Sequence, residues 1–139
     1  MGCTWCYTSA MANHATHAER FFKTAWFSKA ARKAHIADSE LCAAIRQVML
    51  GQADDLGGGV YKKRLSKNQY RSIIVAKGGR YWVYAYLFAK QDQANINEAE
   101  LRDLRALAEV FCNKSDIEIA TDLKVKELTE ICHDELQKV

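Results

Sequence analysis

Hydrophobic and polar positions along the 139-residue chain change period several times, which predicts helices and strands in a mixed order. The stretch Phe21–Phe27, "FFKTAWF", is short and aromatic, as strands often are. Residues 28–36 are rich in alanine and predict a helix. A second helix is expected to begin at Asp38 and to stop at Gly51, because an acidic N-cap and a glycine stop flank it. Two tandem helices after a first strand predict a helical hairpin.

The middle of the chain predicts three strands joined by short turns. They cover Val60–Leu65, Tyr70–Lys77 and Arg80–Ala89, with "SKNQ" between the first two and Gly78-Gly79 between the last two. The third run, "RYWVYAYLFA", is apolar at nearly every position, which is typical of a central strand covered on both faces. Such short links favour antiparallel hairpins.

The C-terminal part predicts further helices. Residues 97–112 place leucines on one helical stripe, and Ser115 with Glu118 forms a capping box for a short helix. Residues 123–131, "LKVKELTEI", alternate, so a strand and a helix both remain open there. The pattern as a whole predicts an α+β domain at 20–139 after a flexible leader at 1–19. Its sheet is expected to be small and mostly antiparallel, with an N-terminal helical hairpin and C-terminal helices.

Composition fits one soluble domain, with 49% hydrophobic residues and no apolar run of the roughly 18 residues that would cross a bilayer. The N-terminus lacks the basic start and apolar middle of a secretory signal, so we expect a cytoplasmic protein. The five cysteines are odd in number and scattered, and in a reducing compartment they are expected to be thiols. Cys42 and Cys112 lie in apolar helical stretches and are expected in the core.

Charge is segregated along the chain. Residues 56–91 contain eight of the 20 Lys and Arg residues and none of the 17 Asp and Glu residues, which leaves 12 cations against 17 acids elsewhere. A segment of +8 beside a remainder of −5 indicates a polyanionic partner such as nucleic acid, although a solvated strand face would give the same count. The eight are Lys62, Lys63, Arg64, Lys67, Arg71, Lys77, Arg80 and Lys90.

Several of these cations are expected to meet on one face of a hairpin. Alternate side chains of a strand share a face, so Lys62 and Arg64 lie together and Arg71 follows just after the turn. These three side chains could bind one phosphate. We expect Tyr61 or Tyr70 to stack on a nearby base, with Lys63 and Lys67 as further RNA contacts.

Such a patch suits RNA cleavage without a metal. Internal cleavage needs a base for the 2′-hydroxyl, positive charge at the phosphate and an acid for the leaving oxygen. Arginine stabilises charge but does not shuttle protons, whereas lysine can act as a base where neighbouring cations lower its pKa. No cofactor and no metal are expected in this chemistry.

Three segments resemble the RelE/HigB superfamily of toxins from bacterial type II toxin–antitoxin systems. They are "ADDLGGGVYKKRL" (53–65), "QYRSIIVAK" (69–77) and "RYWVYAYLFAKQDQANIN" (80–97), and the resemblance extends over residues 21–131. It implies the RelE-like α+β fold and a ribosome-dependent endoribonuclease (an mRNA interferase) that cleaves mRNA and inhibits translation. It also implies ribosome and mRNA as partners, together with a cognate antitoxin, expected to be a helix-turn-helix protein. Neither a membrane nor a small-molecule substrate is expected.

The resemblance also assigns roles to individual residues. Lys62 and Arg64 correspond to the family's basic pair, Arg71 to its phosphate-stabilising arginine and Lys90 to the basic residue that ends the central strand. The chain departs from the family where relatives often carry an arginine or a tyrosine, because Gln91, Gln93 and Asn97 stand there. The leaving-group acid would then be Tyr84, Tyr86 or a ribosomal group.

Other readings remain open. A catalytically impaired module that binds nucleic acid or an antitoxin fits the same cations, and so does a gyrase-directed toxin on the same fold. Cys3, Cys6, His14 and His17 have the spacing C-x2-C-x7-H-x2-H, which suggests zinc, but the spacer is shorter than in ordinary zinc fingers. An unstructured leader is therefore the preferred interpretation of that stretch.

Overall fold

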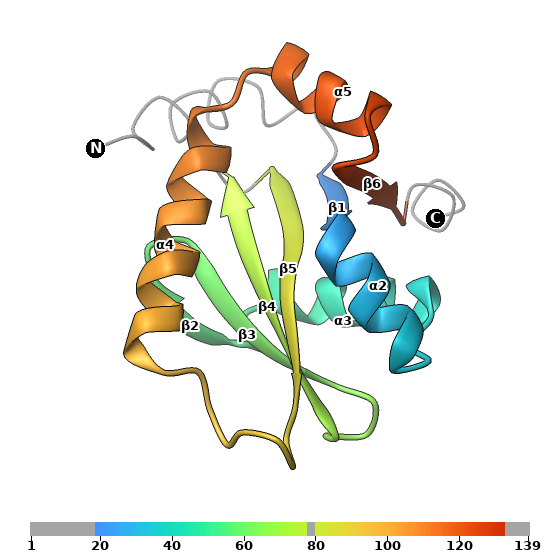
Figure 1. Ribbon diagram of the computed structural model, residues 1–139, viewed down its shortest axis with the longest axis vertical. Helices are drawn as coiled ribbons and strands as arrows, with labels where there is room; N and C mark the ends of the chain where they lie inside the picture. Colours follow the sequence, from blue (N-terminus) through green and yellow to red (C-terminus); the bar gives the residue numbers. More distant parts are fainter. Residues whose placement is uncertain (1–18, 78–79, 133–139) are drawn as a thin grey trace.

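A computed structural model describes residues 19–77 and 80–132 and shows one sheet with helices against both of its faces (Figure 1). The strands are β1 (Arg20–Thr24), β2 (Asp54–Gly57), β3 (Val60–Leu65), β4 (Tyr70–Lys77), β5 (Tyr81–Ala89) and β6 (Leu128–Ile131). The helices are α2 (Ala25–Lys33), α3 (Asp38–Met49), α4 (Glu98–Asn113) and α5 (Asp116–Lys124).

The sheet has the strand order β2-β3-β4-β5-β1-β6 and is mixed. β1 runs parallel to β5, and the other neighbouring pairs are antiparallel. This corrects the prediction of a mostly antiparallel sheet. The chain leaves β1 through two helices and a three-strand meander before β5 returns beside it, and such a long connection allows parallel pairing.

β5 is the central strand that its apolar sequence predicted. Trp82 and Tyr84 face a core shared with α2 and α3, while Val83 and Phe88 face a second core shared with α4. Both cores are closed because helices cover both faces, so β5 carries large side chains on either side. The predicted coverage of this strand is confirmed.

The first strand is shorter than predicted. β1 ends at Thr24, whose side-chain oxygen accepts a hydrogen bond of 3.1 Å from the Phe27 N–H and so caps α2. Trp26 and Phe27 are therefore helical rather than extended. The N-cap hydroxyl outweighs the strand preference of the aromatic residues that follow it.

Both C-terminal helices begin with a capping box. Asn97 and Glu100 cap α4, and Ser115 and Glu118 cap α5 as the sequence predicted. The alternating segment after α5 ends in the strand β6, which pairs with β1 and settles the choice left open there. In the part of the chain that the structure describes, no helix has both the length and the apolar character to cross a bilayer.

β2 is a strand that the sequence pattern missed. Asp54 and Asp55 pair with β3, and a bulge follows at Gly57, which has a φ of 86° that glycine adopts without strain. Arg105 of α4 donates a hydrogen bond to the Leu56 carbonyl and holds the bulge from the helix side. Two adjacent aspartates disfavour a strand locally, so pairing with β3 decides the outcome.

The turn between β3 and β4 is held from both faces of the sheet. Ser66, Lys67 and Asn68 have φ of 53°, 54° and 75°, in the left-handed region that ordinary residues avoid. Glu40 of α3 accepts a hydrogen bond from the Ser66 N–H, and Arg71 donates to the Asn68 carbonyl from the other side. These contacts hold a turn of high local energy in one shape.

A disulfide corrects the expectation that the cysteines are thiols. Cys42 of α3 and Cys132, just after β6, form a buried disulfide with an S–S distance of 2.11 Å. Cys112 is fully buried, as predicted, and is disulfide-bonded as well. The sequence could not reveal the Cys42–Cys132 pair, because its members lie 90 residues apart and meet only when β6 pairs with β1.

Replacing Cys42 and Cys132 together by alanine should lower the free energy of unfolding by about 2 to 4 kcal/mol, because the bond restricts the unfolded chain. Urea denaturation of oxidised wild type and variant measures the difference. An unchanged urea midpoint would show that the bond contributes no stability.

Glu40→Ala should lower the free energy of unfolding by about 1.5 to 3 kcal/mol, since it removes a charged acceptor from the Ser66 N–H. Hydrogen exchange at the Ser66 amide should accelerate, which localises the loss to the turn. Ser39→Ala on the neighbouring exposed position is the matched control. Equal exchange rates in the two variants would contradict this role for Glu40.

Candidate functional site

The pairing of β3 with β4 brings two arginines face to face. Arg64 lies directly opposite Arg71, and Lys62 lies opposite Ile73 two residues along. Alternation places Lys62, Arg64 and Arg71 on the sheet face that α4 partly covers, because Ile73 belongs to the core beneath that helix. The structure therefore places these three cations on one side of one hairpin.

Arg71 is almost buried, with 7% of its surface exposed. Its guanidinium donates hydrogen bonds to the Asn68 carbonyl at 3.0 Å and to the Tyr70 carbonyl at 3.4 Å. Among the described residues no carboxylate lies within ion-pair distance of it. A buried charge is costly to desolvate, so an arginine bound only by neutral carbonyls attracts an anion strongly.

Two further cations at this end of the sheet are exposed. Arg64 and Lys90 make no ion pair with any residue in the described ranges. The Lys90 N–H continues the ladder beyond β5 by donating to the Gln69 carbonyl at 2.9 Å. Alternation puts the Lys90 side chain on the side of Phe88, which pairs with Arg71. Lys90 thus joins the face of the two arginines.

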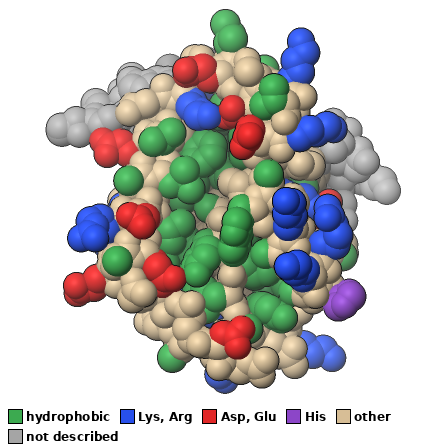
Figure 2. Space-filling model, viewed as in Figure 1, with side chains coloured by type: hydrophobic (Ala, Val, Ile, Leu, Met, Phe, Trp, Pro, Cys, Tyr) green, Lys and Arg blue, Asp and Glu red, His purple; other side chains and the backbone are tan. Residues whose placement is uncertain are grey.

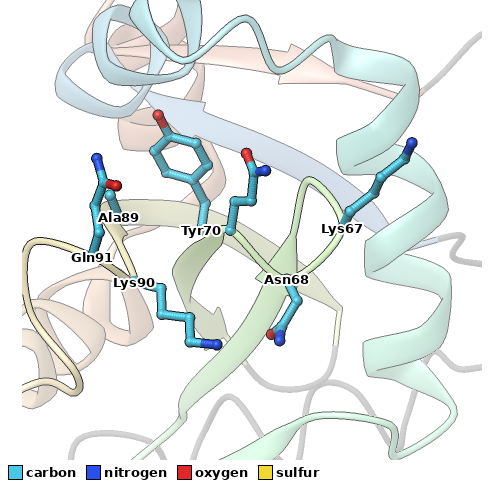
Figure 3. Close-up of a pocket in the computed structure, with 7 residues that line it drawn as sticks. Lys67, Asn68, Tyr70, Ala89, Lys90 and Gln91 are labelled. Atoms are coloured by element: carbon cyan, nitrogen blue, oxygen red, sulfur yellow. The ribbon is translucent and has the colours of Figure 1, made fainter.

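A pocket of about 510 Å³ lies where the hairpin turn meets the end of β5. In Figure 3 the Lys90 side chain extends toward Asn68, whereas the Tyr70 ring and Gln91 point to the other side of the sheet. Lys67, from the turn itself, lines the same pocket. The pocket therefore has cations on both sides of the strand ends.

Lys62 differs from the other cations because it has partners. Its ammonium lies 3.6 Å from a carboxylate oxygen of Asp54 in β2 and donates to the Asn95 side chain at 3.0 Å. Asp54 is the direct register partner of Lys62 across β2 and β3. The positive charge of Lys62 is therefore partly neutralised by a carboxylate from β2, a strand that the sequence pattern had missed.

Tyr61 and Lys63, two predicted RNA contacts, lie on the opposite face of β3. Tyr61 packs against Trp82 with ring centroids 5.8 Å apart, and burial raises its pKa. The Lys63 ammonium donates to the Gln52 carbonyl at 3.1 Å. The structure does not bring these two side chains to the face of Arg64 and Arg71.

Of the two tyrosines considered as an acid, one is inaccessible. The Tyr84 hydroxyl donates a 2.7 Å hydrogen bond to the Leu41 carbonyl inside the core, and burial raises its pKa strongly. Tyr86 lies on the same face as Arg64 and Arg71, because it pairs with Ile73, which pairs with Lys62. Its hydroxyl donates a hydrogen bond of 3.0 Å to a Glu100 carboxylate oxygen. Burial and this hydrogen bond raise the pKa of Tyr86, so it is protonated at neutral pH.

The residues that depart from the family pattern have structural partners or exposed positions. Asn97 caps α4, and Gln93 donates to Glu100 at 3.1 Å. Gln91 is exposed at the rim of the pocket. The hydrogen bond from the Asn97 N–H lowers the pKa of Glu100, so that carboxylate is ionised beside Tyr86. This network could not be read from the sequence, because it joins β5 to the start of α4.

The surface around the α4 face is divided by charge. Figure 2 shows Lys and Arg side chains gathered where α2 lies, acidic side chains over α4, and a hydrophobic band between them. Within residues 19–77 and 80–132, no three His, Cys, Asp or Glu side chains are grouped to hold a metal ion. The zinc-like spacing of the leader lies outside the described residues.

Comparison with known proteins identifies the family of this chain. Residues 19–131 match the family model described as RelE toxin of RelE / RelB toxin-antitoxin system. A search of curated proteins found no match. The matched range includes every described strand and helix. Near its centre lies the β3–β4 hairpin that carries Lys62, Arg64 and Arg71, which we call the cation hairpin. The chain therefore belongs to the RelE family of toxins, whose members act with a cognate antitoxin.

Proposed function

We propose that this toxin is an endoribonuclease that cleaves mRNA on the ribosome without a metal. The observation that carries the proposal is the direct pairing of Arg64 with Arg71, both without a carboxylate partner among the described residues. Two unneutralised guanidinium groups on one face match the charge of a phosphate in its crowded transition state. Lys90 adds positive charge at the rim.

The proposed reaction is an internal transesterification. The 2′-oxygen attacks phosphorus after its proton passes to a base, and the bond between phosphorus and the 5′-oxygen breaks. The leaving 5′-oxygen takes a proton from an acid, which leaves a 2′,3′-cyclic phosphate and a 5′-hydroxyl. In this scheme Arg64 and Arg71 stabilise the added negative charge, which requires no proton transfer from either arginine.

The proton-transfer groups follow from the same face. Lys62 is the candidate base, and it must first leave Asp54 and lose its own proton. Tyr86 is the candidate acid, because it is protonated and lies in the row of Lys62. Of the predicted RNA contacts, Lys67 and Tyr70 line the pocket, and Tyr61 and Lys63 would contribute only from the opposite face.

The proposal includes the partners and the compartment. Ribosome-bound mRNA is the substrate, the antitoxin is a helix-turn-helix protein, and no small molecule or membrane takes part. A ribosomal target places the toxin in the cytoplasm. The Cys42–Cys132 disulfide argues against a reducing compartment, since such bonds are rare there. Alkylation of free thiols in intact cells shows whether Cys42 and Cys132 are reduced or disulfide-bonded there.

A second candidate is a nucleic-acid-binding module that does not cleave. It is favoured by Asn97 and Gln93, which cannot titrate and are held by hydrogen bonds within the fold. The two candidates differ in one product, because only cleavage yields a 5′-hydroxyl end on mRNA. Primer extension after induction of the toxin detects that end.

Arg64→Ala should slow cleavage of mRNA on purified ribosomes on the order of 100-fold, because it removes charge from the transition state. Arg64 is exposed and unpaired among the described residues, so the fold should not change. Arg102→Ala, an exposed arginine of α4, is the matched control. Arg71 is less suitable for this test, since alanine there also releases the hairpin turn. Equal cleavage rates for the two variants would refute the proposed site.

Asp54→Asn should increase cleavage several-fold, because it frees the Lys62 ammonium from its carboxylate. Asp55→Asn removes the same charge one residue along, where the residue pairs with Tyr61, and should have little effect. In a Lys62→Met background the Asp54 substitution should change nothing. A gain that persists without Lys62 would show that Asp54 acts through general charge alone.

A further inference from the structure

A second groove, of about 530 Å³, lies between α2 and the loop after β5. One wall is a single face of α2, where Trp26, Lys29 and Lys33 follow one another at helical spacing. Ala30 and Ala34 lie on the same face, and their small side chains keep the groove open. The proposed cleavage site does not use this wall.

The charge of the groove is positive. α2 contains Lys29, Arg32 and Lys33 and has no acidic residue over its length. Asp92, from the loop, is the carboxylate that lines the groove. Figure 2 shows the cations on this side of the molecule as a cluster apart from the acidic side chains over α4. Such a surface favours an anionic ligand.

Trp26 presents a flat aromatic surface beside these cations. One side of its indole stacks on Tyr86, with ring centroids 5.1 Å apart and an interplanar angle of 31°. The ring centroids of Tyr86 and Phe88 in β5 are 5.9 Å apart, so the indole of α2 adds a third ring to this pair. Trp26 nevertheless remains 51% exposed. A large exposed aromatic residue beside lysines is typical of surfaces that bind single-stranded nucleic acid.

The groove is continuous with the pocket of the cation hairpin. Tyr70, Ala89 and Gln91 line both cavities, so the two meet over these side chains. A strand held at the hairpin therefore has an open path toward α2. The path has lysines at both ends, Lys67 and Lys90 on the hairpin side and Lys29 and Lys33 on the helix side.

We propose that this groove binds the single-stranded RNA adjoining the scissile phosphate, with one base stacked on Trp26. Lys29 and Lys33 are one helical turn apart, about 6 Å along the axis, and would contact successive phosphates. An RNA strand fits better than an acidic peptide helix, because the groove combines an exposed indole, on which a base can stack, with lysines one helical turn apart. This inference rests on the proposed function and adds a base-binding subsite to it.

Binding of a fluorescent single-stranded RNA to the isolated toxin tests the subsite without requiring cleavage. The oligonucleotide carries 2′-O-methyl groups to block cleavage, and a second version has abasic residues with the same phosphates. Trp26→Ala should weaken binding of the first about 10-fold, while Trp26→Phe should keep most of it. Wild type should bind the abasic version about 10-fold more weakly than the first oligonucleotide. Trp26→Ala should bind the two oligonucleotides with equal affinity.

Matched variants separate stacking from charge. Val110→Ala removes a side chain that is also 51% exposed, on α4, and should bind RNA as wild type does. The double variant Lys29→Ala, Lys33→Ala should bind both oligonucleotides more weakly by the same factor. Its binding should also depend less on salt concentration. Lys124→Ala, an exposed lysine of α5, is their control.

Three results would overturn the subsite. The first is full RNA affinity in Trp26→Ala while Arg64→Ala weakens binding, which leaves the proposed function standing. The second is no RNA binding by wild type even at low salt, in which case the ribosome assay alone decides the proposed function. The third is loss of affinity in Trp26→Ala for an acidic helical peptide and not for RNA, which would make the groove a protein-binding surface.

Discussion

Arg71 shapes the candidate site because it carries a buried charge that no described carboxylate neutralises. Its guanidinium binds the carbonyls of Asn68 and Tyr70, and these bonds fix both the arginine and the hairpin turn. The strand register then sets Arg64 opposite it. A phosphate in this position would meet one cation that hydrogen bonds already hold, Arg71, and a second, Arg64, that is free to approach it.

The same hairpin depends on parts of the fold that are distant in sequence. Glu40 of α3 holds the turn on one face, and the pairing with β5 fixes Lys90 on the other. β2 adds Asp54 beside Lys62, which places a carboxylate within reach of the candidate base. The candidate site and the fold are therefore coupled through a few contacts around one turn.

Local signals predicted most of the elements. The strands at 60–65 and 70–77 agree with the structure at both ends, because turn residues and apolar runs mark them clearly. The capping box at Ser115 likewise located α5. Three features depended on non-local pairing and were missed: the parallel contact of β1 with β5, the strand β2 and the Cys42–Cys132 disulfide. No local pattern encodes which segment will lie beside another.

The candidate site was predictable to the same extent. Alternation predicted Lys62 and Arg64 on one face and the hairpin turn predicted Arg71 near them, and the register places all three on that face. By the same alternation Tyr61 and Lys63 lie on the other face. Only the structure shows their partners there, the core for Tyr61 and the Gln52 carbonyl for Lys63. The sequence did not predict the Trp26 surface, because "FFKTAWF" suggested a strand. Trp26 shares a face with Lys29 and Lys33 only when all three belong to one helix.

The central claim is that Arg64 and Arg71 bind one phosphate together. NMR of the arginine Nε–H groups, during titration with a 2′-O-methyl RNA trinucleotide, observes both side chains at once. The account predicts that the two resonances shift together and give the same dissociation constant. A shift of Arg64 alone, or of neither, would contradict it.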